Sequence, residues 1–193
     1  MLYCATGNAG KLREFRLAGL PLKPLPRMAS LPACEETGDT FEANAILKAK
    51  YYGQHADGLL FADDSGLEVD ALGGAPGIYS ARYARAGATD SENNALLVKN
   101  LENVADRNAK FVCVIALADR GRLVGTFRGE VAGKILHESR GSEGFGYDPL
   151  FYYEKFGCSF GEVAMERKFG VSHRGEALGK MAAYLKRHFS SAP

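Results

Sequence analysis

The chain has 193 residues, of which 46% are hydrophobic and 24% are charged, and its formal net charge is +1. This length predicts one large domain or two small lobes around a core that needs no disulfide or metal for stability. The balanced charge and the absence of long apolar or single-sign runs argue against nucleic-acid binding, membrane spans and a signal peptide.

The first third of the chain predicts alternating strands and helices. The expected elements are a strand at Leu2–Ala5, a helix at Lys11–Ala18, an extended piece inside the connector Pro21–Pro32, a helix that follows the capping-box spacing of Asp39–Glu42 and reaches about His55, a strand at Leu59–Ala62, a turn at Asp63–Gly66 and further extended chain at Leu67–Asp70. The final helix of the chain is expected to be capped by Ser172 and to reach Phe189.

The middle of the chain predicts a hairpin between helical and glycine-rich segments. The expected elements are a loop at Gly73–Gly87, a capping box at Thr89–Glu92 with a helix to Leu101, strands at Phe111–Ala118 and Leu123–Val131 joined by a turn, a strand at Lys134–His137, a loop at Gly141–Asp148 and an extended segment at Pro149–Tyr153. Because βα units flank a hairpin, we expect an α/β fold with a mixed central sheet and helices on both sides.

Four cysteines are present, and none has CxxC or zinc-finger spacing. Cys4 and Cys113 lie in apolar, strand-like runs, which favours small core residues over reactive thiols. A reducing compartment fits this distribution, so we expect a cytoplasmic protein.

The segment Thr6–Lys11 joins the first strand to the first helix and contains two glycines and a lysine. Glycine amides at a helix N-terminus, together with a lysine, suit a polyphosphate. The spacing differs from that of a Walker A loop. The alternative is an ordinary βα turn with a surface lysine.

Acidic residues precede a helix at Glu35-Glu36 and end a buried strand at Asp63-Asp64. Such carboxylates could bind Mg²⁺ and activate water, although Asp-Asp-Ser-Gly is also good turn chemistry. Lys48 on the intervening helix could pair with phosphate or with Asp64, and the alternative is a solvated lysine.

Two further motifs could contact a nucleobase. Phe145 stands between glycines ahead of Tyr147 and Asp148, so its ring could stack on a purine while Asp148 accepts hydrogen bonds. Lys168, His173 and Arg174 could donate to a base carbonyl. The alternatives are a core aromatic in a turn, a partly buried helix-start histidine and an arginine in a salt bridge.

The order of these motifs resembles the Ham1/inosine triphosphate pyrophosphatase family from Ala5 to about Leu185. The matching blocks are Ala5–Lys11, Glu35–Ala45, Ala62–Leu67, Gly73–Tyr83, Gly144–Phe151 and Ser172–Gly175. The resemblance implies Mg²⁺-assisted hydrolysis of noncanonical purine triphosphates such as ITP, dITP and XTP to the monophosphate and pyrophosphate. It also implies a homodimer of two-lobed subunits, each a single domain over residues 1–193, with the active site in the cleft between the lobes.

The resemblance assigns roles residue by residue. The triphosphate site would comprise Thr6, Gly7, Asn8, Ala9, Gly10, Lys11, Lys48 and Ser65, the metal site Glu36 and Asp64, and the base site Phe145, Gly146, Tyr147, Asp148, Lys168, His173 and Arg174. Asp64 would also accept the proton of the attacking water.

Hydrogen-bond chemistry gives a reason for base selection. Hypoxanthine and xanthine carry an acceptor oxygen at C6, whereas adenine carries an amino donor there. Donors from His173 and Arg174 would pair with the former and be left unpaired by the latter, at about 1–3 kcal/mol each. Guanine shares the C6 oxygen, so these two donors would pair with guanine as well as with hypoxanthine.

Two other functions fit parts of the sequence. One is a Maf-like pyrophosphatase acting on modified pyrimidine nucleotides or dTTP, which the Gly144–Asp148 and Ser172–Arg174 blocks argue against. The other is a regulator that holds a purine nucleotide without hydrolysing it. Glu36, Lys48 and Asp64 argue against that, because a sensor needs neither a complete set of metal ligands nor a general base.

Overall fold

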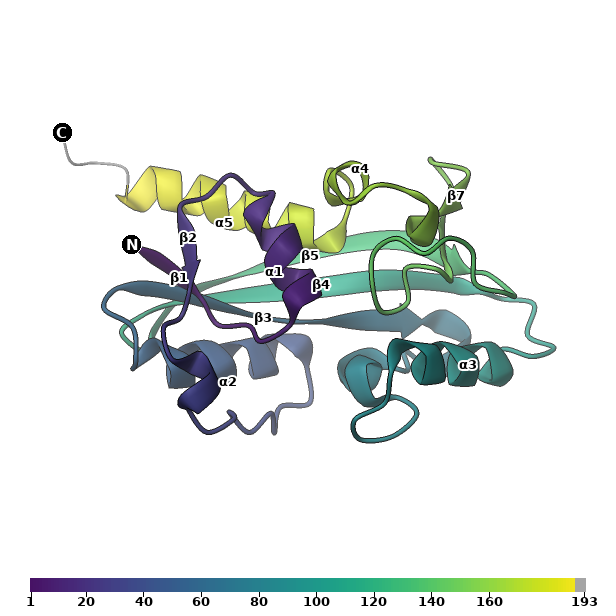
Figure 1. Ribbon diagram of the computed structural model, residues 1–193, viewed down its shortest axis with the longest axis horizontal. Helices are drawn as coiled ribbons and strands as arrows, with labels where there is room; N and C mark the ends of the chain where they lie inside the picture. Colours follow the sequence, from purple (N-terminus) through teal and green to yellow (C-terminus); the bar gives the residue numbers. More distant parts are fainter. Residues whose placement is uncertain (190–193) are drawn as a thin grey trace. The chain divides into compact units, whose positions relative to one another are not determined.

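The computed structural model describes residues 1–189 and contains a mixed seven-stranded sheet with the strand order β2-β1-β3-β4-β5-β6-β7 (Figure 1). The strands are β1 (Leu2–Cys4), β2 (Leu22–Pro24), β3 (Leu59–Val69), β4 (Asn108–Asp119), β5 (Arg122–Ile135), β6 (Phe151–Tyr153) and β7 (Cys158–Ser159). The helices are α1 (Ala9–Arg16), α2 (Phe41–Gly53), α3 (Asp90–Asn100), α4 (Met165–Phe169) and α5 (His173–Phe189). Short 3-10 turns occur at Met28–Ser30, Asp70–Leu72, Gly77–Arg82 and Phe160–Glu162. The expected α/β class with a mixed sheet is confirmed.

The chain forms two compact units. Unit 1 comprises Met1–Asp64, Cys113–Gly129 and the chain from His173 onward, and unit 2 comprises Ser65–Val112 and Glu130–Ser172. The chain therefore changes unit inside β3, inside β4 and inside β5. The single two-lobed domain expected from the sequence stays a prediction.

Unit 1 places β1 between two parallel neighbours, with Cys4 opposite Pro24 of β2 and Phe61 of β3. Helix α2 covers one face of its strands, and α1 and α5 cover the other (Figure 1). Phe15 of α1 packs edge-on against Phe61 at a centroid distance of 5.2 Å. Ala177 and Met181 of α5 are fully buried.

Side-chain caps fix where the unit 1 helices begin. Helix α1 begins two residues before its expected start, because Asn8 accepts the Lys11 amide at 3.0 Å. Helix α2 is capped by Thr40, which accepts the Ala43 amide at 3.0 Å. The expected capping box at Asp39–Glu42 is therefore wrong by one residue, and Glu42 instead accepts the hydroxyl of Thr126.

Strand β3 is continuous where the sequence predicts a turn at Asp63–Gly66, so that prediction is wrong. The turn does not form because β3 continues beside its neighbour β4, and because lysines neutralise both carboxylates. Strand β5 ends at Ile135, so the expectation of a separate strand at Lys134–His137 is wrong. Its first two residues are the end of β5, and Leu136 and His137 lie outside any strand.

The core of unit 2 contains a cluster of aromatic side chains. Phe151 lies 4.4 Å from Phe111 and 5.0 Å from Phe160, measured between ring centroids. Helix α3 lies on one side of these strands and α4 on the other (Figure 1). The expected capping box of α3 is confirmed, because the side chains of Thr89 and Glu92 each accept the other's backbone amide.

All four cysteines are unpaired thiols, as expected, and Cys4 and Cys113 are completely buried. Burial raises the pKa of Cys4 to about 11, which keeps it a neutral core thiol. Within residues 1–189, no helix combines the length and the apolar composition that a membrane crossing requires.

Candidate active site

The loop Thr6–Lys11 lies at the N-terminus of α1 in unit 1. Thr6 Oγ1 accepts the Asn8 amide at 3.2 Å, and Asn8 caps the helix, so side chains within the loop fix its shape. Gly7, Asn8 and Ala9 are exposed, and a Cβ added at Gly7 would meet no atom within 4 Å. The loop therefore offers an accessible helix N-terminus, where anions are favoured.

Lys48 forms ion pairs with both carboxylates that the sequence predicts to bind a metal, Glu36 and Asp64. Its Nζ lies 2.8 Å from Asp64 Oδ1 and 3.3 Å from Glu36 Oε2, and only 12% of its side chain is exposed. Of the alternatives for Lys48, the pairing with Asp64 is present, and the solvated lysine is wrong. Asn44 Nδ2 also donates to Asp64, at 3.5 Å. Glu36 and Asp64 can therefore act on one positive charge.

These carboxylates fit a magnesium ion that binds together with phosphate. Residues 1–189 contain no group of three or more His, Cys, Asp or Glu side chains able to hold a metal. Mg²⁺ does not need such a group, because it commonly binds through one or two carboxylates, water and substrate phosphates. Glu36 and Asp64 supply that number of hard oxygen donors.

A second set of ion pairs lies next to Asp64 in unit 1. Lys11 Nζ lies 2.8 Å from Asp63 Oδ2, and the carboxylate is only 1% exposed. Arg174 Nη1 lies 2.9 Å from the buried carboxylate of Glu14. The salt-bridge alternative for Arg174 is thus present. Sequence reasoning missed Asp63 and Glu14 as partners, although a glutamate on the apolar face of α1 was a signal for Glu14.

The adjacent carboxyls of Asp63 and Asp64 have pKa values shifted in opposite directions. Burial raises the pKa of Asp64 above its ordinary value, and the attraction of Lys48 offsets only part of that rise. Burial acts on Asp63 too, but the attractions of Lys11, Arg174 and Lys48 exceed it and lower the pKa of that carboxyl. Asp63 is therefore a fixed anion, while Asp64 is the better proton acceptor.

Unit 2 contains the Phe145 loop. Asp148 Oδ2 accepts the Phe145 amide at 2.9 Å and the ammonium of Lys168 at 2.5 Å. Asp148 and Lys168 are each 1% exposed, whereas Phe145 is partly exposed. Lys168 Nζ lies 5.1 Å from the centre of the Phe145 ring. Lys168 thus lies within cation–π distance of the ring, and Asp148 binds the backbone amide of Phe145.

The structure groups the expected site residues by unit. Unit 1 holds Thr6–Lys11, Glu36, Lys48, Asp64 and, at the start of α5, the buried His173 and Arg174. Unit 2 holds Ser65 within β3, Phe145, Gly146, Tyr147, Asp148 and Lys168. Tyr147 is buried and donates its hydroxyl to Ser80 O at 2.8 Å, which indicates a supporting role for that ring.

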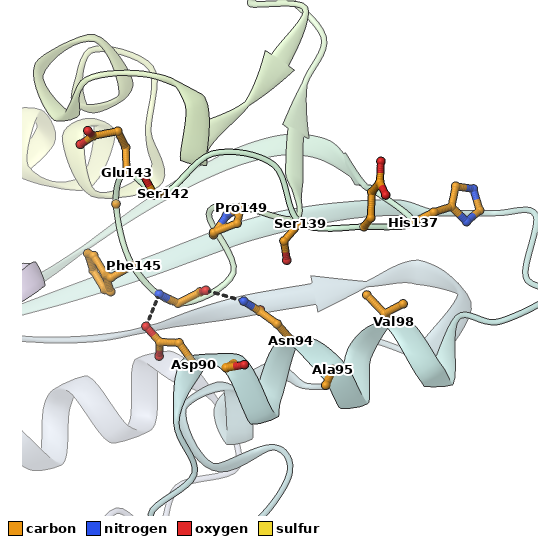
Figure 2. Close-up of a pocket in the computed structure, with 14 residues that line it drawn as sticks. Asp90, Asn94, Ala95, Val98, His137, Ser139, Ser142, Glu143, Phe145 and Pro149 are labelled. Atoms are coloured by element: carbon orange, nitrogen blue, oxygen red, sulfur yellow. Dashed lines mark hydrogen bonds between the residues drawn. The ribbon is translucent and has the colours of Figure 1, made fainter.

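A hollow of about 660 Å³ lies in unit 2 between α3 and the segment from His137 to Pro149 (Figure 2). Phe145 stands at one end of this hollow, and His137 stands towards the other. Its volume lies within the range of about 300–1,000 Å³ that is typical of small-molecule sites.

Gly144 is required by both its backbone and its surroundings. Its φ is +74°, and an added Cβ would overlap Asp148 Oδ2. We expect Gly144→Ala to lower the free energy of unfolding by at least about 2 kcal/mol, measured by urea denaturation. Gly146→Ala is the matched control, because Gly146 has a φ of +64° and no atom within 4 Å of its Cβ position. Equal losses in the two variants would contradict the steric part of this prediction.

Comparisons with known proteins decide the family. The model of the Ham1 family matches residues 2–184. The chain belongs to the Ham1 family. Among its relatives, the dITP/XTP pyrophosphatase of Geobacter sulfurreducens is 48% identical, over 97% of this chain and 95% of the relative. The dITP/XTP pyrophosphatase of Acidobacterium capsulatum is 45% identical, over 95% and 97%.

Solved structures of Ham1 proteins have the same fold. The Staphylococcus aureus Ham1 protein superposes with a TM-score of 0.87 at 39% identity, covering 96% of this chain and 98% of that one. The Coxiella burnetii HAM1 protein gives a TM-score of 0.86 at 38% identity, with the same coverage. The Ham1 architecture therefore extends over nearly the whole chain.

Proposed function

We propose that this Ham1 protein hydrolyses noncanonical purine nucleoside triphosphates, namely dITP, XTP and ITP, to the monophosphate and pyrophosphate. The observation that carries the proposal is the pair of carboxylates, Glu36 and Asp64, which share one cation in the same unit as the exposed phosphate loop. The similarity to proteins named dITP/XTP pyrophosphatase, over 95% or more of this chain in the two relatives above, supports the substrate class.

Glu36 and Asp64 would hold Mg²⁺, which would supply a Lewis acid for the phosphate oxygens when bound. Asp64 would take the proton of the water that attacks the α-phosphorus, a role that its raised pKa favours. Lys48, held between the carboxylates, would neutralise charge that develops on the phosphates. Ser65, the next residue of β3, would contact the same phosphates.

The leaving pyrophosphate would be stabilised by Lys11 and by the amides of the exposed loop. Asp63 holds the ammonium of Lys11 at 2.8 Å, so the lysine is oriented before the substrate arrives. A preoriented cation costs no reorganisation when charge appears on the leaving group. The other loop residues, Thr6 to Gly10, would contribute backbone contacts.

The base would stack on Phe145, whose loop includes Gly146, Tyr147 and Asp148. Stacking on an aromatic ring contributes about 1–3 kcal/mol per base and does not depend on base identity. Selection would come from donors at His173, Arg174 and Lys168 that match the C6 oxygen. Glu14 holds Arg174 at 2.9 Å and would fix the direction of that donor.

We also propose a homodimer, as the family resemblance implies. The unpaired thiols fit a location in the cytoplasm. The balanced charge fits a small-molecule nucleotide as the partner, without nucleic acid or membrane.

A substrate panel with pyrophosphate readout tests the proposed reaction. We expect kcat/KM for ITP, dITP and XTP to exceed that for ATP at least about a hundredfold. The reason is that the donors of His173 and Arg174 would face the amino group of adenine and stay unpaired. Each substrate is assayed with and without Mg²⁺, and turnover should require the metal. ATP cleaved as fast as ITP would contradict the selectivity. Preference for dTTP would favour the Maf-like alternative, and a thermal shift by ITP without turnover would favour the regulator.

A further inference from the structure

Both polar backbone groups of Gly146 are bound by side chains of α3. The Gly146 amide donates to Asp90 Oδ2 at 2.6 Å, and its carbonyl accepts from Asn94 Nδ2 at 3.0 Å (Figure 2). Gly146 directly follows Phe145, the ring proposed to stack on the base. Residues more than 50 positions away in the sequence, at separations of 56 and 52, thus bind the peptide beside that ring.

Helix α3 is a firm support for these contacts. Asp90 is its first residue and Asn94 follows one turn later, so the two side chains lie on the same face. The capping box of Thr89 and Glu92 fixes the start of the helix. Asn93 is buried and accepts the Ala84 amide at 2.9 Å, which fastens the helix on another face.

The Phe145 loop needs such a support at this point. Gly146 has a left-handed φ of +64°, and a Cβ there would touch no atom within 4 Å. The space on the Cβ side of Gly146 is open, so we expect the hydrogen bonds to Asp90 and Asn94 to be the main restraint on this peptide. The Gly146 carbonyl can only accept, so the amide of Asn94 must present its nitrogen to it. Within residues 1–189, Asn94 Oδ1 is buried and has no hydrogen-bond partner, which fits an amide oriented by this one contact.

We propose that Asp90 and Asn94 are positioning residues that hold the Gly146 peptide and thereby set the Phe145 ring for the purine. This inference rests on the proposed function, because it assumes that Phe145 stacks on the base. Asp90 and Asn94 act through Phe145, so their loss affects recognition of the base and leaves binding of the triphosphate unchanged.

The test compares Asp90→Ala and Asn94→Leu with wild type, using dITP as substrate and inorganic tripolyphosphate as a competitive inhibitor without a base. We expect KM for dITP to rise about tenfold in each variant, since partial loss of stacking is equivalent to about that factor. The tripolyphosphate inhibition constant should stay at the wild-type value. Asp90→Asn keeps an acceptor oxygen and should restore most of the affinity. Ser91→Ala, an exposed neighbour that borders the same hollow, is the control.

Phe145→Ala, measured in parallel, separates the two proposals. If Phe145→Ala raises KM for dITP while Asp90→Ala and Asn94→Leu do not, the positioning role is overturned and the stacking role stands. If Phe145→Ala leaves KM unchanged, the stacking role fails and the positioning role fails with it. A matching rise in the tripolyphosphate inhibition constant would show general loss of structure and would also overturn the positioning role.

Discussion

Asp64→Asn is expected to lower kcat for dITP by about 10²- to 10⁴-fold, the usual contribution of a positioned general base. The amide has nearly the same size as the carboxylate but cannot accept a proton at neutral pH. Asp64 lies inside the continuous strand β3, so its backbone position should not change. In the wild-type protein Glu36 lies 3.3 Å from Lys48, so the Lys48 ammonium should keep this partner in the variant.

The measurement is pyrophosphate release under saturating dITP, with circular dichroism to verify the fold. Asp70→Asn is the matched control, because this exposed residue directly follows the same strand and is paired with no lysine in residues 1–189. Its turnover should equal that of wild type. If Asp64→Asn turns over near the wild-type rate, Asp64 is not the general base. The description of the fold does not depend on this result.

Lys168→Met is expected to lower the free energy of unfolding by about 3–5 kcal/mol, because it removes the ammonium that pairs with the buried carboxylate of Asp148. Both side chains of this pair are almost completely buried, at 1% and 2% exposure. Since a domain is stable by only about 5–15 kcal/mol, the loss should shift the denaturation midpoint strongly. Chemical denaturation followed by circular dichroism measures it.

Two variants show whether burial of the charge causes the loss. Lys168→Met combined with Asp148→Asn removes both charges and should recover a large part of the stability. Lys180→Met breaks an exposed pair with Glu176, whose side chains are 52% and 45% exposed, and should cost at most about 1 kcal/mol. A loss in Lys168→Met as small as that in Lys180→Met would contradict the prediction.

Most of the fold could be predicted because its elements carry local signals. The apolar run of β4, the capping box of α3 and the hydrophobic face of α5 each depend on residues a few positions apart. The elements missed, β7 and α4, have two and five residues, which is too short for a periodic pattern. The turn predicted at Asp63–Gly66 is absent because β4 and two lysines, which lie far along the chain, stabilise an extended strand there instead.

The candidate site could be predicted in composition but only partly in its pairing. The pairing of Lys48 with Asp64 was one of the alternatives that the sequence left open, and the structure contains it. Glu14 and Arg174 are separated by 160 residues, and only the tertiary packing of α1 on α5 reveals their contact. The contacts of Asp90 and Asn94 could not be predicted either. Their partner is the Gly146 backbone, and a backbone group cannot be identified from residue types.

The way the chain passes between the two units has a consequence for biosynthesis. Unit 2 ends at Ser172, whereas unit 1 requires helix α5, which begins at His173. As the ribosome synthesises the chain from its amino end, unit 2 has all its residues while unit 1 still lacks its last helix. Glu14 is synthesised 160 residues before Arg174, the cation that binds it. The nascent chain can therefore complete the phosphate-binding unit only after α5 has been synthesised.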